Sequence, residues 1–202
     1  MKKSLFIVVD GIDGSGKTEI VKMLHNYLSS AYKKYRVLTT REPTDGRYGK
    51  MIRKMLREEK DPKSNGRKIM ELFVKDRQWH LKNEIEPFLE SGNAVVLCDR
   101  YYYSTIAFQA VQGLDVNELI AKNKPFRKPE IAFILDVKPE IALERIVYRQ
   151  KEKFEHLEFM RKIRANFLKM PKLLKDNIKI INASKPLKNV FEIVKKEVDK
   201  LI

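Results

Sequence analysis

The chain has 202 residues, the length of a single domain, and hydrophobic residues make up 43% of it, which excludes a disordered chain. It carries 42 lysines and arginines against 27 aspartates and glutamates, and the net charge of +15 indicates either a polyanionic partner or a lysine-rich surface. No apolar run approaches the ~20 residues of a membrane span. The single cysteine, Cys98, excludes an internal disulfide and a cysteine-based zinc site. We therefore expect a cytoplasmic protein.

Short apolar runs alternate with longer amphipathic segments along the chain. The runs predict buried strands at residues 5–9, 37–40, 94–98, 131–135 and 178–181. The amphipathic segments predict helices at residues 17–35, 48–60, 68–90, 116–122, 139–149, 157–174 and 187–201. Helices that connect buried strands are typical of a parallel sheet with helical crossovers. We therefore expect an α/β fold, a five-stranded parallel sheet with helices on both faces, formed by one domain over residues 1–202.

The first predicted strand leads into GIDGSGKT, which matches the phosphate-binding pattern G-x-x-x-x-G-K-[ST]. Between a buried strand and an amphipathic helix, backbone N–H groups and the helix N-terminus surround a phosphate. The lysine of the pattern reaches the β- and γ-phosphates, and the hydroxyl that follows it binds Mg²⁺. No guanine-binding N-K-x-D follows, which argues against a GTPase. We assign the triphosphate of a purine nucleotide to the eight residues of the pattern: Gly11, Ile12, Asp13, Gly14, Ser15, Gly16, Lys17 and Thr18.

Functional side chains also follow two other predicted strands. Asp99 and Arg100 come directly after the third strand, and Arg41 follows the second. Because the carboxyl ends of parallel strands meet at one edge of a sheet, we expect these side chains beside the phosphate loop. Asp99 is then a candidate for binding Mg²⁺ together with Thr18. Arg41 and Arg100 suit a donor phosphate and an acceptor phosphate, since a guanidinium can bind a phosphate through two hydrogen bonds.

Taken together, five segments in this order resemble the thymidylate kinase family: GIDGSGKT, TREP, DRYYYSTIAFQ, FILDVKPEIALERI and INASKP. The resemblance covers nearly the whole chain and implies a three-layer P-loop kinase fold, usually a homodimer, with a short lid at residues 149–156 that closes over ATP. It implies transfer of the γ-phosphoryl group of ATP to dTMP, which gives dTDP for dTTP synthesis, by direct in-line displacement with Mg²⁺. The catalytic residues that it implies are Lys17, Arg41, Asp99, Arg100 and, in the lid, Arg149.

The resemblance also implies a dTMP site. Phe73 would stack on thymine and Arg77 would bind the edge of the base; four residues apart in a predicted helix, they share one face. Tyr101 and Phe108 would line the sugar and disfavour a 2′-hydroxyl. The remaining dTMP-binding residues by resemblance are Asp13 near the 3′-hydroxyl, Arg41 and Arg100 at the phosphate, and Ser104 and Thr105 beside the base.

The chain departs from the family pattern at a few positions. It has REPTDG where R-E-P-G-G is frequent, so the loop on the acceptor side differs in shape, and Phe108 stands where a tyrosine is frequent. Gly14 occupies a position at which eukaryotic-type members have an arginine, which is why the catalytic arginine is expected in the lid.

Two other functions are compatible with parts of the sequence. One is a kinase that acts on another (deoxy)nucleoside monophosphate such as dUMP, and the other is a P-loop module that binds nucleic acid. The net charge favours the second, but no helix-turn-helix or RNA-recognition signature is present. We expect ATP and dTMP as partners, and no stable nucleic-acid or membrane partner.

Overall fold

The structure, a computed structural model, describes residues 4–58, 65–146 and 154–202, without the side chains of residues 154–156. The strands are β1 (Leu5–Asp10), β2 (Arg36–Arg41), β3 (Ala94–Asp99), β4 (Ile131–Asp136) and β5 (Ile178–Asn182). The helices are α1 (Lys17–Ala31), α2 (Arg47–Glu58), α3 (Gly66–His80), the π-helical turn η1 (Leu81–Ile85), α4 (Glu86–Glu90), α5 (Tyr102–Val111), α6 (Val116–Asn123), α7 (Pro139–Ile146), α8 (Phe154–Leu173) and α9 (Leu187–Asp199).

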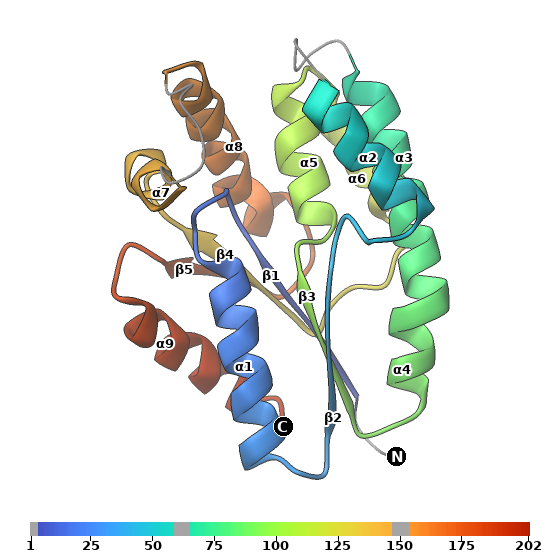
Figure 1. Cartoon of the computed structure of the whole chain (residues 1–202), viewed down its shortest axis with the longest axis vertical. Helices are drawn as coiled ribbons and strands as arrows, with labels where there is room; N and C mark the ends of the chain where they lie inside the picture. Colours follow the sequence, from blue (N-terminus) through green and yellow to red (C-terminus); the bar gives the residue numbers. More distant parts are fainter. Residues whose placement is uncertain (1–3, 59–64, 147–153) are drawn as a thin grey trace.

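The strands form one parallel sheet in the order β2-β3-β1-β4-β5 (Figure 1). The three central strands are the continuous apolar runs and are almost fully buried, whereas β2 and β5 lie at the edges and are partly exposed. The five-stranded parallel sheet predicted from the sequence is therefore confirmed.

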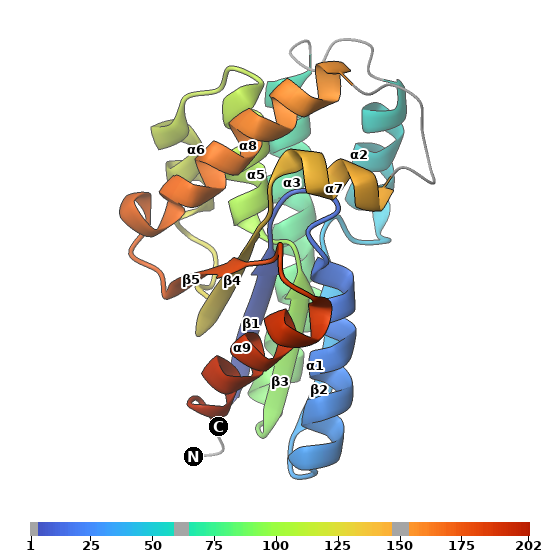
Figure 2. The same ribbon diagram turned by 90° about the vertical axis from the view of Figure 1, so that its left-hand side faces the viewer.

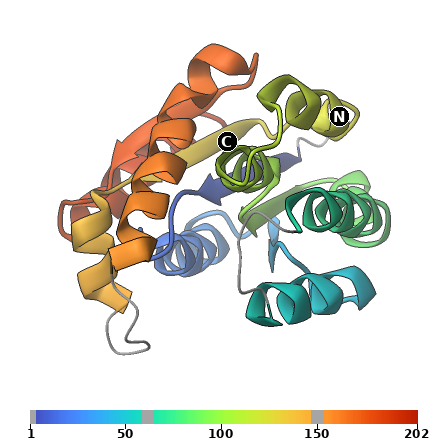
Figure 3. The same ribbon diagram turned by 90° about the horizontal axis from the view of Figure 1, so that it is seen from above.

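Helices cover both faces of this sheet. On one face α1 packs on β1, β2 and β3, and α9 packs on α1 and β5. On the other face α4 contacts β3, and α8 contacts β4 and β5. Figure 2 shows α1 and α9 together on the first face, and Figure 3, from above, shows α5 between α8 and α3. This three-layer arrangement is the predicted P-loop kinase architecture. Within the described parts of the chain, every helix is too short or too polar to cross a membrane.

The helix predictions differ from the structure in two places. Helix α5 was not expected, because YYSTIAFQAV is apolar almost all round and shows no amphipathic period; packed between α3 and α8, most of its side chains are buried. The single helix predicted over residues 68–90 is divided into α3, η1 and α4 by the π-helical turn. Residues 149–153 of the expected lid lie outside the described residues.

The register of the central strands brings their carboxyl ends together. Asp99 of β3 pairs with Val9 of β1 on one side and with Arg41 of β2 on the other. The phosphate loop, Arg41 and Asp99 therefore meet at one edge of the sheet, as the sequence predicted.

Candidate active site

The phosphate loop joins β1 to α1 and wraps around the ammonium group of Lys17. Lys17 Nζ donates a hydrogen bond of 2.7 Å to the carbonyl oxygen of Ile12, and its side chain is almost completely buried. Burial lowers the pKa of Lys17 to about 8, and the positive charge of Arg100 acts in the same direction. The loop thus holds a positive charge in a site from which water is largely excluded, which favours an anionic ligand.

Gly14 allows helix α7 to approach this loop closely. Its φ is +76°, and a Cβ at this position would lie 2.3 Å from the carbonyl oxygen of Ala142 in α7. The side of the loop facing α7 is also held by Arg145, which donates to the carbonyl oxygens of Gly14 (3.4 Å) and Ala183 (3.0 Å). A larger side chain at position 14 is therefore incompatible with this packing.

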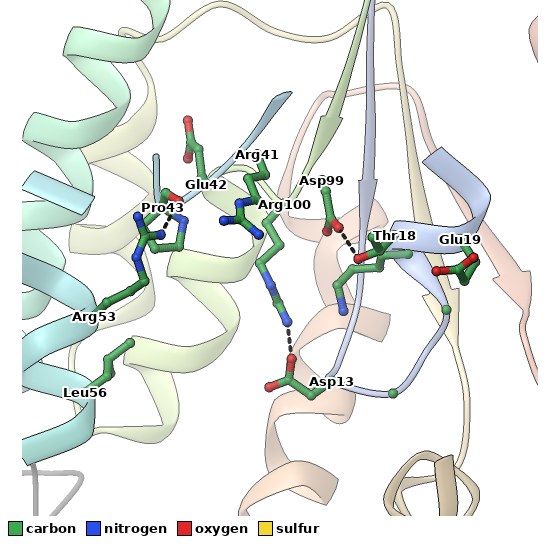
Figure 4. A pocket seen from close by; sticks show the side chains of 13 residues that line it. Asp13, Thr18, Glu19, Arg41, Glu42, Pro43, Arg53, Leu56, Asp99 and Arg100 are labelled. Carbon is green, nitrogen blue, oxygen red and sulfur yellow. Dashed lines mark hydrogen bonds and ion pairs between the residues drawn. The ribbon is translucent and has the colours of Figure 1, made fainter. Parts of the chain in front are cut away.

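Thr18 and Asp99 supply the oxygen atoms of a candidate magnesium site. Thr18 Oγ1 donates a hydrogen bond of 2.6 Å to Asp99 Oδ2 (Figure 4). A hydroxyl and a carboxylate beside a phosphate loop fit Mg²⁺, which uses one or two carboxylates and completes its shell with phosphate oxygens and water. Across the described residues, no cluster of three or more histidine, cysteine, aspartate or glutamate side chains suited to a metal occurs.

Arg100 connects the phosphate loop to α5. Its guanidinium donates to Asp13 Oδ1 (2.5 Å), to the carbonyl oxygen of Gly11 (3.2 Å) and to Ser104 Oγ (2.9 Å). The charge of Arg100 lowers the pKa of Asp13. Arg100 has a φ of +72°, a strained conformation for a residue with a side chain, and such strain is concentrated at functional sites.

Asp10 connects the phosphate loop to α5 through buried hydrogen bonds. Its carboxylate is fully buried and accepts hydrogen bonds from the N–H groups of Gly11, Tyr101 and Ser104 and from the Ser104 hydroxyl. It thereby joins the end of β1, the start of the phosphate loop and the N-terminus of α5. Burial raises the pKa of Asp10, although Arg100 nearby opposes the shift.

A polar cleft of about 480 Å³ opens in front of the phosphate loop. Arg41, Arg53 and Arg100 enter it from β2, α2 and the end of β3 (Figure 4). Arg41 is exposed and its Nη2 lies 3.3 Å from Asp45 Oδ1. The remaining residues of the cleft are Asp13, Gly14, Gly16, Lys17, Thr18, Glu19, Glu42, Pro43, Leu56 and Asp99.

A second, more apolar cavity of about 480 Å³ lies beside this cleft. The rings of Phe73, Tyr101 and Phe108 line it together with Ser104, Asp13 and Arg100, which places six of the predicted dTMP-binding residues around one space. Gln109 also lines it. The Gln109 side-chain nitrogen donates to Gln112, whereas its buried Oε1 finds no hydrogen-bond partner among the described residues. Asp13, Glu42, Pro43, Leu56 and Arg100 line both this cavity and the cleft.

Arg77 and Thr105 are not part of this lining; they lie behind the wall of the cavity. The Arg77 guanidinium is completely buried and donates to Glu42 Oε2 (2.9 and 2.7 Å), Asn123 Oδ1 (2.5 Å) and Thr105 Oγ1 (3.0 Å). His80 Nδ1 lies 3.2 Å from the other oxygen of Glu42. The predicted contacts of Arg77 and Thr105 with a base stay predictions, and Arg149, the predicted lid arginine, lies outside the described residues.

Sequence reasoning did not identify Asp10, Glu42, Arg53 or Gln109. Asp10 and Glu42 carried a local signal, because each is an acidic residue at the end of a predicted strand. Arg53 and Gln109 lie within helices, and only the packing of α2 and α5 brings them to the cavities.

Comparisons with known proteins agree with this geometry. The family model described as thymidylate kinase matches residues 9–194. A protein of Archaeoglobus fulgidus named "Probable thymidylate kinase" is 40% identical over 98% of this chain and 96% of its own length. A "Thymidylate kinase" of Clostridium novyi is 34% identical over 96% of this chain and 98% of its own length. The chain therefore belongs to the thymidylate kinase family, a family of nucleoside monophosphate kinases.

Proposed function

We propose that this enzyme transfers the γ-phosphoryl group of ATP to dTMP, forming dTDP and ADP by direct in-line displacement with Mg²⁺. Family membership and the names of the relatives support the reaction class and dTMP as the acceptor. The observation that carries the proposal is that Arg100 lines both cavities. A donor phosphate at the phosphate loop and an acceptor in the apolar cavity would meet at this guanidinium.

The donor side is formed by the phosphate loop. Lys17 would hold the β- and γ-phosphates, and the loop N–H groups would bind the remaining phosphate oxygens. Thr18 and Asp99 would hold Mg²⁺, which would supply positive charge against the negative charge of the phosphates. Because the pKa of Lys17 is lowered, part of this amine would be uncharged at slightly alkaline pH, and the triphosphate would bind best to the protonated form.

The acceptor base would occupy the apolar cavity. Phe73 offers a ring for stacking, and Gln109 Oε1 is a buried acceptor that needs a donor. The N3–H group of thymine or uracil is such a donor, whereas cytosine has an acceptor at that position. The rings of Tyr101 and Phe108 would lie against the sugar. The Tyr101 hydroxyl donates to the carbonyl oxygen of Arg127, so it would not compete for the nucleotide.

The phosphoryl step requires that two polyanions be brought together. ATP and dTMP together carry about six negative charges at neutral pH, and two unit charges 4 Å apart interact with ~4 kcal/mol at an effective dielectric constant of 20. Lys17, Arg41, Arg53 and Arg100 surround the cleft in which the phosphates would meet. An oxygen of the acceptor phosphate would attack the γ-phosphorus of ATP, while the bond between the γ-phosphorus and the leaving oxygen of ADP breaks. No covalent enzyme intermediate is needed.

A coupled assay of ADP formation tests the proposal. Purified protein is supplied with ATP and Mg²⁺ and with dTMP, dUMP, UMP, CMP, AMP or GMP in turn. We expect the highest kcat/KM with dTMP, a lower value with dUMP because uracil retains N3–H but lacks the methyl group, and little activity with CMP. Turnover of dTMP at background level would refute the proposal, and a clear preference for dUMP would identify a kinase of a different acceptor.

We also propose that the enzyme is a cytoplasmic homodimer. The family resemblance supports both statements, and Met51 on α2 and Trp79 on α3 are large apolar side chains that the single chain leaves exposed. Sedimentation equilibrium tests the dimer: a mass of one chain, 23.8 kDa, at micromolar concentration would contradict it.

A further inference from the structure

The turn that follows β2 is attached to α3 by two consecutive residues of that helix. We call residues 42–46 the acceptor turn. Asp76 accepts two hydrogen bonds from Thr44, one from the backbone N–H (2.7 Å) and one from the hydroxyl (2.7 Å). Arg77 donates to Glu42 through Nε and Nη2. All four side chains are at most 4% exposed, so an acidic and a basic residue of α3 hold the two ends of the segment 42–44 in a buried environment.

The Thr44 hydroxyl makes contacts that the glycine of the R-E-P-G-G pattern cannot make. It donates to Asp76 and accepts from the N–H of Gly46 at 3.1 Å, so the hydroxyl is used both as a donor and as an acceptor.

Helix α2 closes the other side of the turn. A Cβ at Gly49 would lie 1.8 Å from the Thr44 carbonyl oxygen, so the two backbones are in direct contact. Arg53 donates to the Pro43 and Thr44 carbonyl oxygens from the same helix.

The acceptor turn and α3 carry residues from both parts of the proposed acceptor site. Arg41 directly precedes the turn and lines the phosphate cleft, whereas Phe73 lies one helical turn before Arg77 and lines the apolar cavity. The contact between Thr44 and Asp76 therefore connects the segment that follows Arg41 with the helix that carries Phe73.

We propose that Thr44 and Asp76 are positioning residues that set the spacing between the phosphate subsite and the base subsite for a nucleoside monophosphate. The inference rests on the proposed function, and it concerns the acceptor rather than ATP. The phosphate loop is held by its own contacts, from Lys17 to Ile12 and from Gly11 to Asp10. A monophosphate bound at both ends loses affinity when one subsite moves, because its phosphate and base can then reach both subsites only in a less favourable conformation. Loss of the contact should therefore weaken acceptor binding selectively.

The chain contains its own reporter for this turn. Trp79 is the only tryptophan, and its ring carbons lie 3.8 Å from the position that a Cβ of Gly46 would occupy. Trp79 is also on α3, three residues after Asp76. Its fluorescence is therefore expected to respond when an acceptor binds beside the turn.

Thr44→Val and Thr44→Ser provide a matched pair, since only valine removes the hydroxyl. The measurements are the KM for dTMP, the KM for ATP, and the midpoint of the Trp79 fluorescence change on titration with dTMP. We expect Thr44→Val to raise the dTMP KM and the fluorescence midpoint about tenfold, with the ATP KM changed less than about twofold, because one hydrogen bond to a buried carboxylate is lost. Thr44→Ser should restore wild-type values, and Asp76→Asn should act like Thr44→Val.

Three results would overturn the inference. These are an unchanged dTMP KM in Thr44→Val, equal increases of both KM values, or a Thr44→Ser variant as impaired as Thr44→Val. Equal increases would indicate a merely structural contact. If Thr44→Val does not fold, Asp76→Asn decides by the same comparison of the two KM values. Failure of the proposed function is distinct, since it would appear as wild-type protein that does not phosphorylate dTMP.

Discussion

Thr18 and Asp99 are 81 positions apart in the chain, and the Thr18 hydroxyl donates a hydrogen bond of 2.6 Å to the Asp99 carboxylate. The contact exists because β1 and β3 are adjacent parallel strands, so the helix after β1 begins beside the end of β3. A hydroxyl oxygen and a carboxylate are thereby placed side by side next to the phosphate loop.

Asp99→Asn tests whether this pair holds the metal. We expect the Mg²⁺ concentration for half-maximal activity to rise about 10- to 100-fold, because a charged ligand becomes a neutral one. Asp136→Asn is the matched control: Asp136 also ends a strand of the sheet, but it pairs with Arg164 at 2.6 Å and lies outside both cavities. An equal change of the Mg²⁺ requirement in both variants would contradict the assignment.

The lowered pKa of Lys17 predicts that nucleotide binding depends on pH. In the free enzyme this pKa is about 8, and the phosphates of ATP would raise it, so binding should take up a proton above pH 8. The contribution of Lys17 to ATP affinity should be constant below pH 7 and fall as the pH rises through 8 to 9. Calorimetry at pH 9 in buffers of different ionisation enthalpy should show uptake of about one proton. Lys17→Arg, which does not titrate in this range, should show none; uptake that persists in this variant would assign the proton to another group.

Arg41→Ala should impair use of the acceptor. We expect kcat/KM for dTMP to fall by the equivalent of at least about 2 kcal/mol, since a charge-assisted hydrogen bond to the acceptor phosphate is lost. Arg36→Ala is the control, because Arg36 is an exposed arginine at the opposite end of the same strand. Steady-state kinetics with varied dTMP measures both, and a near-wild-type value for Arg41→Ala would show that Arg41 does not hold the acceptor.

Gln109→Leu tests recognition of the base. The variant removes the buried oxygen that has no partner among the described residues, and we expect kcat/KM for dTMP to fall about tenfold or more. The preference for dTMP over dCMP should decrease as well, because leucine does not distinguish N3–H from N3. Gln78→Leu, an exposed position on α3, should leave both values unchanged. An unaltered preference in Gln109→Leu would exclude this contact.

Gly14→Ala and Gly113→Ala separate backbone strain from a steric clash. Both glycines have a positive φ, +76° and +94°, but a Cβ at Gly14 would meet the Ala142 carbonyl oxygen at 2.3 Å, whereas no described atom lies within 4 Å of a Cβ at Gly113. Gly113→Ala should lower the free energy of unfolding by about 1 kcal/mol. Gly14→Ala should lower it further and weaken ATP binding. Denaturant unfolding and ATP titration measure these effects, and equal values for the two variants would show that α7 does not contact the loop as tightly as described.

The sheet, the phosphate loop and the strand-end residues could be predicted from the amino-acid sequence. Continuous apolar runs identify buried parallel strands, and residues that directly follow them must lie at the carboxyl edge of the sheet. Lys17, Arg41, Asp99 and Arg100 could be placed together for this reason. The aromatic cavity was expected only through family resemblance, since the rings of Phe73 and Phe108 carry no local signal that separates a ligand wall from a core.

Tertiary structure alone decided what surrounds these residues. Helix α5 was missed because a segment buried on all sides has no amphipathic period, and Gln109 was missed with it. Arg77 was predicted to bind the edge of the base, and that contact stays a prediction; the sequence did not indicate its buried contact with Glu42, 35 residues earlier. The attachment of Thr44 to Asp76 likewise joins residues 32 positions apart. Periodicity reports what each segment buries, whereas the partner of a buried polar group depends on how distant segments pack, and that is set only when the whole chain folds.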